Sequence, residues 1–236
     1  MNKTREQTHQ FFQQFAEKNL DPKKDVVFCV PFTNLGIARE YADEQGFTVG
    51  AQNFHPAKSG AYTGEISAEM LTEIGAKVVL IGHSERRALF GETDQFINQK
   101  VKAALDNSLY VVLCIGETLD QREGNKTKKV LASQLEKGLA DIILPQSDWY
   151  QLVVAYEPVW AIGTGKVATL EQIEETHKFV KNQLNKLYPD ITIPVLYGGS
   201  ANEKNAAEIL AVPGVDGVLV GGASLDPDKF AAIINS

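Results

Sequence analysis

Seven short apolar runs constrain the fold of this 236-residue chain more than any other feature of its sequence. They are rich in Val, Ile and Leu, and their apolar residues follow one another instead of alternating with polar ones. Continuous runs of this length are typical of strands buried on both faces, as in parallel sheets. The runs are 26–30, 47–52, 77–82, 110–116, 151–156, 193–198 and 217–221.

Amphipathic helical patterns lie between these runs. One pattern forms a single apolar stripe that includes His177, for which we expect a structural role. The stripe consists of Leu170, Ile173, His177, Val180, Leu184 and Leu187. Another helical pattern opens the chain, from Thr4 to about Lys18. The sequence therefore predicts an α/β fold in which a helix precedes seven strand–helix units, with a parallel sheet and right-handed crossovers.

The number of strands leaves two architectures open. An eight-stranded α/β barrel begins with a strand and needs all eight strands to close, whereas this chain opens with a helix and offers seven strands. Either the first strand of a barrel is missing from this polypeptide, or the sheet is open. No linker-like stretch divides the chain, so we expect one barrel-sized domain over residues 1–236.

Charge and composition exclude several classes of protein. The formal net charge is −7, whereas a general nucleic-acid binder carries a basic surface. No apolar stretch approaches the roughly 18 residues of a membrane span, and residues 1–10 lack the apolar core of a signal peptide. The two cysteines, Cys29 and Cys114, are too few for a disulfide framework. We therefore expect a cytoplasmic protein with no nucleic-acid or membrane partner.

Polar residues that follow the strands are the candidates for catalysis, because active sites of parallel α/β folds lie at the carboxyl ends of the strands. Glu157 directly follows the run 151–156, and a carboxylate partly walled by apolar neighbours suits a general base. His83 follows the run 77–82 and precedes a helix start, which disfavours the imidazolium and leaves a neutral hydrogen-bond donor. Each residue alone also has an ordinary structural interpretation, but the two on one rim favour catalysis.

The segment that follows this carboxylate has the composition of a moving lid. Pro158 and Trp160 are stiff, whereas Gly163 and Gly165 allow many backbone conformations. The residues of this candidate lid segment are Pro158, Val159, Trp160, Ala161, Ile162, Gly163, Thr164, Gly165 and Lys166. The segment is not an ATP-binding P-loop, because Val167 follows the lysine where that motif needs Ser or Thr.

Three glycine-containing turns, at 163–165, 198–200 and 221–222, are candidates for binding an anion. Glycine lets backbone N–H groups approach a phosphate closely, and barrels often bind phosphate after their seventh and eighth strands. With one strand missing upstream, Ser200, Gly221 and Gly222 fall on those two loops. Tight turns also use glycine, so only the three turns together favour a phosphate site. No constellation of metal ligands is present, and we expect no metal.

These segments resemble the triosephosphate isomerase family. The resemblance is carried by residues 82–87, 155–166, 197–200 and 221–224, and it extends over nearly the whole chain. The motif Gly60-Ala61-Tyr62-Thr63-Gly64-Glu65 is also similar to the long intersubunit loop of that family. The resemblance implies a TIM barrel of the (β/α)8 type, with seven strands and eight helices in this chain. It also implies a homodimer in which the loop that carries Thr63 and Glu65 reaches the partner's site.

The resemblance implies a reaction without metal or cofactor. Family members interconvert dihydroxyacetone phosphate and D-glyceraldehyde 3-phosphate, a step of glycolysis and gluconeogenesis. Glu157 would move a proton between two substrate carbons, neutral His83 would stabilise the enediolate oxygens, and Glu85 would lie near His83. The phosphate of this small triose substrate would be held by Gly163, Ser200, Gly221 and Gly222.

The start of the chain departs from the family pattern. The family opens with a strand that ends in Asn-x-Lys and then continues into sequence like Met1-Asn2-Lys3-Thr4. We therefore expect the first strand and its catalytic lysine to be missing from this polypeptide, and Lys3 is not equivalent to that lysine. Loss of one preorganised charge costs about 3–4 kcal/mol of transition-state stabilisation.

Three alternatives compete with this interpretation. Another phosphate-binding barrel enzyme would need a different base and no Glu-Pro-Val-Trp lid. A truncated or degenerate barrel would bind a sugar phosphate or a protein partner without turnover, which the absent lysine favours and the intact rim disfavours. A third possibility is a chain that folds only when another polypeptide donates the missing strand, in which case it would be insoluble alone.

Overall fold

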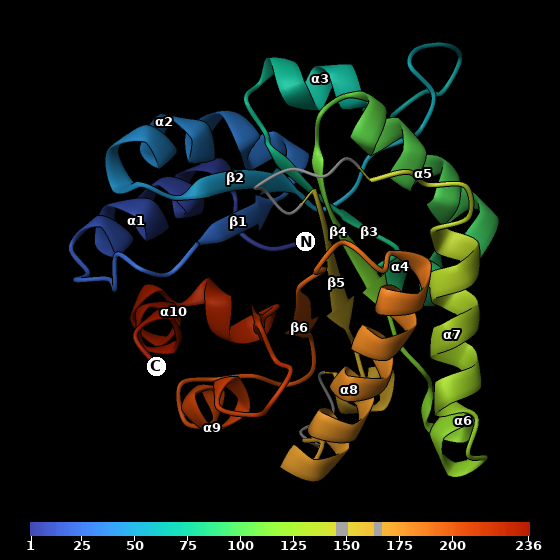
Figure 1. Cartoon of the computed structure of the whole chain (residues 1–236). Coiled ribbons are helices and arrows are strands. Elements are labelled where there is room, and N and C mark those ends of the chain that lie inside the picture. The colour runs from blue at the N-terminus through green and yellow to red at the C-terminus, as the bar shows by residue number, and fades with distance from the viewer. Residues whose placement is uncertain (145–150, 163–166) are drawn as a thin grey trace.

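Seven parallel strands form one sheet in the computed structural model, which describes residues 1–144, 151–162 and 167–236 (Figure 1). The strands are β1 (Val27–Val30), β2 (Thr48–Ala51), β3 (Val78–Ile81), β4 (Tyr110–Ile115), β5 (Leu152–Tyr156), β6 (Val195–Tyr197) and β7 (Gly217–Val218). Each pairs with the next along the chain. All seven predicted strands are confirmed, but the last is shorter than its apolar run, because its partner β6 ends at Tyr197.

Ten α-helices occur in the described residues, where the sequence predicted eight. They are α1 (Arg5–Ala16), α2 (Leu35–Gln45), α3 (Ala68–Glu73), α4 (Ser84–Leu89), α5 (Asp94–Asp106), α6 (Leu119–Glu123), α7 (Thr127–Gly138), α8 (Leu170–Leu187), α9 (Ala206–Leu210) and α10 (Pro227–Ile234). The two additional helices, α4 and α6, are short and precede a longer helix in the same connection. They form because His83 and Thr118 cap their first turns with side-chain hydrogen bonds. No described helix has the length and apolar composition needed to cross a membrane.

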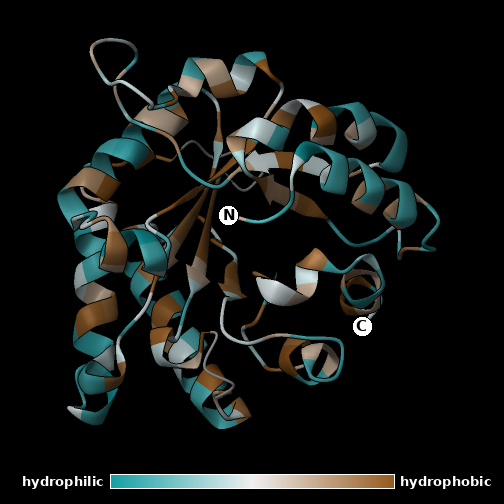
Figure 2. Ribbon diagram, turned by 180° about the vertical axis from the view of Figure 1, so that it is seen from behind, coloured by the Kyte–Doolittle hydropathy of each residue, from teal (hydrophilic) through white to brown (hydrophobic). Residues whose placement is uncertain are grey.

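The helices lie outside the sheet. Figure 2 shows largely hydrophobic strands surrounded by helices in which hydrophobic and hydrophilic residues are mixed. Helix α1 begins as predicted at Thr4, which forms a capping box with Gln7. Its buried Phe12 and Phe15 both pack edge-on against Phe28 of β1, with ring centroids 5.1 Å apart. The buried phenylalanines of α1 therefore join the first helix to the first strand of the sheet.

The outer layer of helices continues across the gap between the two edge strands of the sheet. Among the described residues, β1 and β7 are the two edges of the sheet and no pairing joins them. Outside this gap, Phe15 of α1 stacks on Phe230 of α10 at 6.1 Å, and Lys18 Nζ lies 2.5 Å from Asp228 Oδ1. Figure 1 shows the two helices side by side across the gap. The curled sheet is therefore consistent with a barrel that is open between β1 and β7.

A buried group of charged side chains ties α5 to neighbouring elements. Lys100 and Glu92 are 1% and 7% exposed, and Lys100 Nζ lies 2.5 Å from Glu92 Oε1. Lys100 also donates to Asn53 Oδ1 at 2.6 Å, and Arg86 Nε of α4 lies 2.5 Å from the same Glu92 oxygen. Burial lowers the pKa of Lys100, and the hydrogen bond and charge of Glu92 oppose that effect. The ammonium therefore depends on Glu92 for its charge compensation.

We expect Glu92→Gln to lower the free energy of unfolding by about 3–5 kcal/mol, because it leaves a buried ammonium without its counter-charge. Urea denaturation measures the change. The matched control is Glu175→Gln, which breaks an exposed pair with Lys128 and should cost less than about 1 kcal/mol. Equal small losses in both variants would contradict the prediction.

Candidate active site

Two side chains predicted to share one rim are in direct contact. His83 follows β3 and Glu157 follows β5, and His83 Nε2 lies 2.9 Å from Glu157 Oε1. The backbone N–H of Ser84 donates to the other carboxylate oxygen, Oε2, at 2.9 Å. Glu157 is 2% exposed, whereas a quarter of the His83 side chain is open to solvent. The carboxylate is therefore buried, held by two donors, and reached from outside beside the imidazole.

The hydrogen bonds of His83 indicate which ring nitrogen carries the proton. The backbone N–H of Glu85 donates to Nδ1 at 3.3 Å, so Nδ1 is an acceptor. Nε2 then carries the hydrogen and donates to Glu157, which is the neutral tautomer that can polarise a carbonyl group. The Glu85 carboxylate, the third predicted catalytic group, is exposed, with Oε2 3.9 Å from Nδ1.

The pKa of His83 differs from the direction expected of a helix N-terminus. Burial lowers this pKa, but the hydrogen bond and the charge of Glu157, with a smaller effect of Glu85, raise it above its ordinary value. Protonated His83 thus stabilises the folded chain below the unfolded-state pKa, and this contribution is lost as the pH rises through the folded-state pKa. The pKa of His83 is raised, not lowered, because the Glu157 carboxylate contacts the ring directly. The sequence predicted only that the two residues lie on the same rim.

Glu117 belongs to the same region and was not predicted. It is fully buried, and its Oε1 accepts hydrogen bonds from Tyr156 Oη at 3.1 Å, Trp160 Nε1 at 3.0 Å and Arg122 Nη1 at 3.0 Å. Trp160 lies in the 3₁₀ helix Val159–Ala161 that begins the predicted lid. Glu117 therefore anchors the start of the lid to the end of β4. A signal was available, because Glu117 follows a predicted strand in the same way as Glu157 does.

The turn at 198–200 contacts the base and the start of the lid. A Cβ at Gly198 would lie 2.9 Å from Glu157 Cγ, and one at Gly199 would overlap the Tyr197 hydroxyl. These two glycines are therefore explained by close packing in the protein itself, in addition to any anion. Ser200 Oγ donates to Ala161 O at 2.5 Å.

The structure describes only some of the remaining residues that were predicted to bind the phosphate. Gly221 and Gly222 are exposed, and a Cβ at either position would meet nothing within 4 Å. Their backbone is thus open to solvent at the start of the 3₁₀ helix Gly222–Leu225. Gly163, Thr164, Gly165 and Lys166, which the sequence assigned to the lid and the phosphate site, lie outside the described residues.

Comparison with known proteins decides the family. The family model for triosephosphate isomerase matches residues 1–236. The chain belongs to the triosephosphate isomerase family. It is 44% identical over 237 residues to the triosephosphate isomerase of Trichormus variabilis, covering all of this chain and 95% of that protein. It is 42% identical over 241 residues to that of Synechococcus sp., covering all of this chain and 91% of the relative. The triosephosphate isomerase of Carboxydothermus hydrogenoformans is 48% identical over 213 residues, with 89% and 84% covered.

The segment that resembles the intersubunit loop of triosephosphate isomerases projects from the body of the molecule (Figure 1). A backbone hydrogen bond from His55 N to Ile66 O, 2.8 Å long, closes its base, and Glu65 N donates to Tyr62 O in a turn near its tip. Thr63 and Glu65 are exposed there. No described contact joins either residue to His83 or Glu157 of the same chain.

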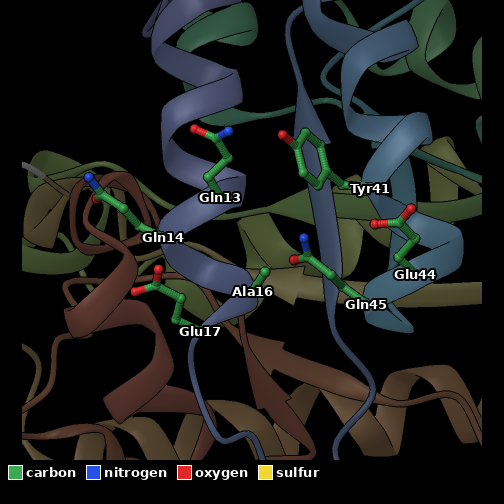
Figure 3. A pocket seen from close by; sticks show the side chains of 7 residues that line it. All are labelled: Gln13, Gln14, Ala16, Glu17, Tyr41, Glu44 and Gln45. Atoms are coloured by element: carbon green, nitrogen blue, oxygen red, sulfur yellow. The ribbon is translucent and has the colours of Figure 1, made fainter.

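A hollow elsewhere on the surface of this triosephosphate isomerase family member is not part of the site. It lies between α1 and α2 (Figure 3). Its lining consists of Gln13, Gln14, Ala16, Glu17, Tyr41, Glu44 and Gln45. Gln45 Nε2 donates to Phe12 O at 3.2 Å, and Tyr41 Oη contacts His9 Nδ1 at 2.6 Å. These contacts hold the two helices together, and none of the predicted site residues lines the hollow.

Proposed function

We propose that this chain interconverts dihydroxyacetone phosphate and D-glyceraldehyde 3-phosphate by proton transfer through an enediolate. The observation that carries the proposal is the buried Glu157 carboxylate in contact with His83 Nε2 at the ends of β5 and β3. A carboxylate base beside a neutral imidazole donor is the pair that such a transfer needs: one group takes the carbon-bound proton, and the other stabilises the developing oxyanion.

The ligand-free arrangement must change before the reaction. Both oxygens of Glu157 accept hydrogen bonds, one from Ser84 N and one from His83 Nε2. The substrate carbonyl takes over the hydrogen bond from His83, and the carboxylate moves towards the carbon that bears the proton. Glu85, on the exposed side of His83, contributes negative charge near the imidazole.

The lid and the phosphate-binding residues complete the proposed site. Residues 158–166 close over the substrate, and the backbone of Gly163, Gly221 and Gly222 with Ser200 holds the phosphate. Exclusion of water protects an enediolate phosphate, which otherwise loses its phosphate. The anchor from Glu117 to Trp160 and the bond from Ser200 to Ala161 support this proposal, because both hold the first turn of the lid against the rim.

The proposed functional unit is a cytoplasmic homodimer of single barrel domains spanning residues 1–236. The exposed loop around Thr63 supports the dimer, because it projects from the molecule without closing over its own site. In the homodimer, Thr63 and Glu65 approach the site of the partner. We further propose that the first strand of the family, ending in Asn-x-Lys, fits between β1 and β7. The ammonium of Lys3 does not replace that lysine, because it lies over the Phe11 ring, 4.9 Å from its centroid.

Turnover by the 236-residue chain of confirmed intact mass tests the proposal. Dihydroxyacetone phosphate is supplied in D₂O, and NMR follows deuterium incorporation and formation of D-glyceraldehyde 3-phosphate. Glu157→Gln, purified in the same way, reports any host isomerase in the preparation. Turnover that is lost in this variant supports the proposal. A soluble chain that binds the substrate without exchanging its proton would instead favour the degenerate barrel.

A further inference from the structure

The end of β4 lies between the two strands that carry the catalytic pair. His83 follows β3, Glu157 follows β5, and β4 pairs with both strands. Gly116 is the first residue after β4, and a Cβ there would overlap the carbonyl oxygen of Glu157. The backbone of Gly116 therefore forms the surface against which the backbone of Glu157 rests. Any movement of Gly116 moves the base relative to His83.

Strand β3 leaves the sheet before β4 ends. Its last paired residues are Ile81 and Leu113, and Gly82 then turns the chain with φ +73°. On its other side, β4 still pairs with β5 as far as Ile115. Beyond Leu113, the backbone groups of β4 that face β3 have no strand partner and need other ones.

Side chains from the helix layer supply those partners. Gln134 of α7 accepts a hydrogen bond from Gly116 N at 2.8 Å and donates one to Gly116 O at 3.0 Å. Its amide thus reproduces the donor and the acceptor that a neighbouring strand would offer. Arg87 of α4 similarly donates from Nη2 to Cys114 O at 3.1 Å. Gln134 is the described side chain that binds both backbone groups of the residue in contact with Glu157.

We propose that Gln134 is a positioning residue for the isomerisation, which fixes Gly116 and through it the location of the Glu157 carboxylate. The inference rests on the proposed function. The backbone N–H of Glu157 donates to Ile115 O at 2.7 Å, so the base is attached to the same strand end that Gln134 holds. When Gln134 is lost, this strand end shifts towards the space left by β3. A displacement of about 1 Å at a catalytic group costs on the order of 10²-fold in rate.

The first test is Gln134→Met, which keeps the length of the side chain and removes both hydrogen bonds. The matched control is Asn98→Leu. The Asn98 amide is likewise half-buried and donates two hydrogen bonds to backbone carbonyls, at Gly138 O (3.1 Å) and Ala140 O (2.9 Å), and neither acceptor belongs to a predicted site residue. We expect kcat of Gln134→Met to fall by about 10- to 100-fold with KM little changed, and kcat of Asn98→Leu to stay at the parent value. Urea midpoints show whether the two variants lose similar stability.

The second test does not depend on turnover. NMR titration follows His83, which faces the carboxylates of Glu157 and Glu85. We expect its pKa to fall in Gln134→Met, because Glu157 is no longer held at the ring, and to stay unchanged in Asn98→Leu. If both variants lose kcat in proportion to stability and the His83 pKa stays unchanged in both, Gln134 is only structural and the proposal is overturned. If the parent itself shows no turnover, the proposed function fails, and the titration alone decides the role of Gln134.

Discussion

Replacing Glu157 by glutamine should lower isomerase kcat by about 10³-fold or more and leave the barrel folded. Removal of a general base costs about 10²–10⁴-fold, and in the proposed mechanism the same group both takes the proton and returns it. The amide cannot accept from both donors that the carboxylate binds, Ser84 N and His83 Nε2. One donor thus loses its partner, while the packing around Gly198 is kept because the two side chains have the same shape. Steady-state kinetics in both directions measure the loss.

The same variant makes a second measurable change that separates catalysis from folding. The charge and hydrogen bond of Glu157 raise the pKa of His83, so this pKa should fall in Glu157→Gln. A matched control is Glu175→Gln, a surface carboxylate paired with Lys128, which should alter neither kcat nor the His83 titration. Retention of parental kcat in Glu157→Gln would exclude this carboxylate as the base, whatever the titration shows.

The strands and the positions of the candidate pair, Glu157 and His83, were predictable because their signals are local. A continuous run of Val, Ile and Leu marks a strand buried on both faces, whatever its neighbours are. Glu157 and His83 each directly follow such a run, and parallel strands bring their carboxyl ends to one rim. The sequence therefore placed both residues on that rim. It did not predict that they would touch, because contact requires β3 to leave the sheet at Gly82 and the pair to meet over the end of β4.

The buried and half-buried polar residues away from the strand ends were missed for a different reason. Gln134 lies within a helix among other polar residues, and its partner Gly116 is 18 positions away in sequence. Lys100 and Glu92 belong to residue types that are usually exposed, yet both are buried and paired. In each case the contacts of the residue arise from tertiary packing, and the periodicity of the sequence does not predict them. Glu117 is the exception, because it directly follows the apolar run 110–116 and could have been selected in the same way as Glu157.

Supplying the proposed eighth strand should raise kcat/KM of this chain by about 10²-fold or more. An N-terminal extension that forms a short apolar strand ending in Asn-x-Lys would pair with β1 and β7, the two edges of the sheet in the part of the chain that the structure describes. The helix layer already closes over this gap through the Phe15–Phe230 contact. One preorganised donor or charge at the reacting oxygens is worth about 10²–10³-fold in kcat. Steady-state kinetics of the extended and unextended chains, with urea denaturation, measure both effects.

The same extension with methionine in place of its lysine separates the strand from the charge. It should recover the stability that comes from pairing two exposed sheet edges, because that gain depends on the backbone and the apolar side chains, but it should recover little turnover. Lys3→Met, in the unextended chain, should leave turnover unchanged, because this ammonium lies over the Phe11 ring. Full turnover with the methionine extension would show that barrel closure alone completes the site. Equal turnover of the extended and unextended chains would show that Glu157 and His83 suffice without either the strand or its lysine.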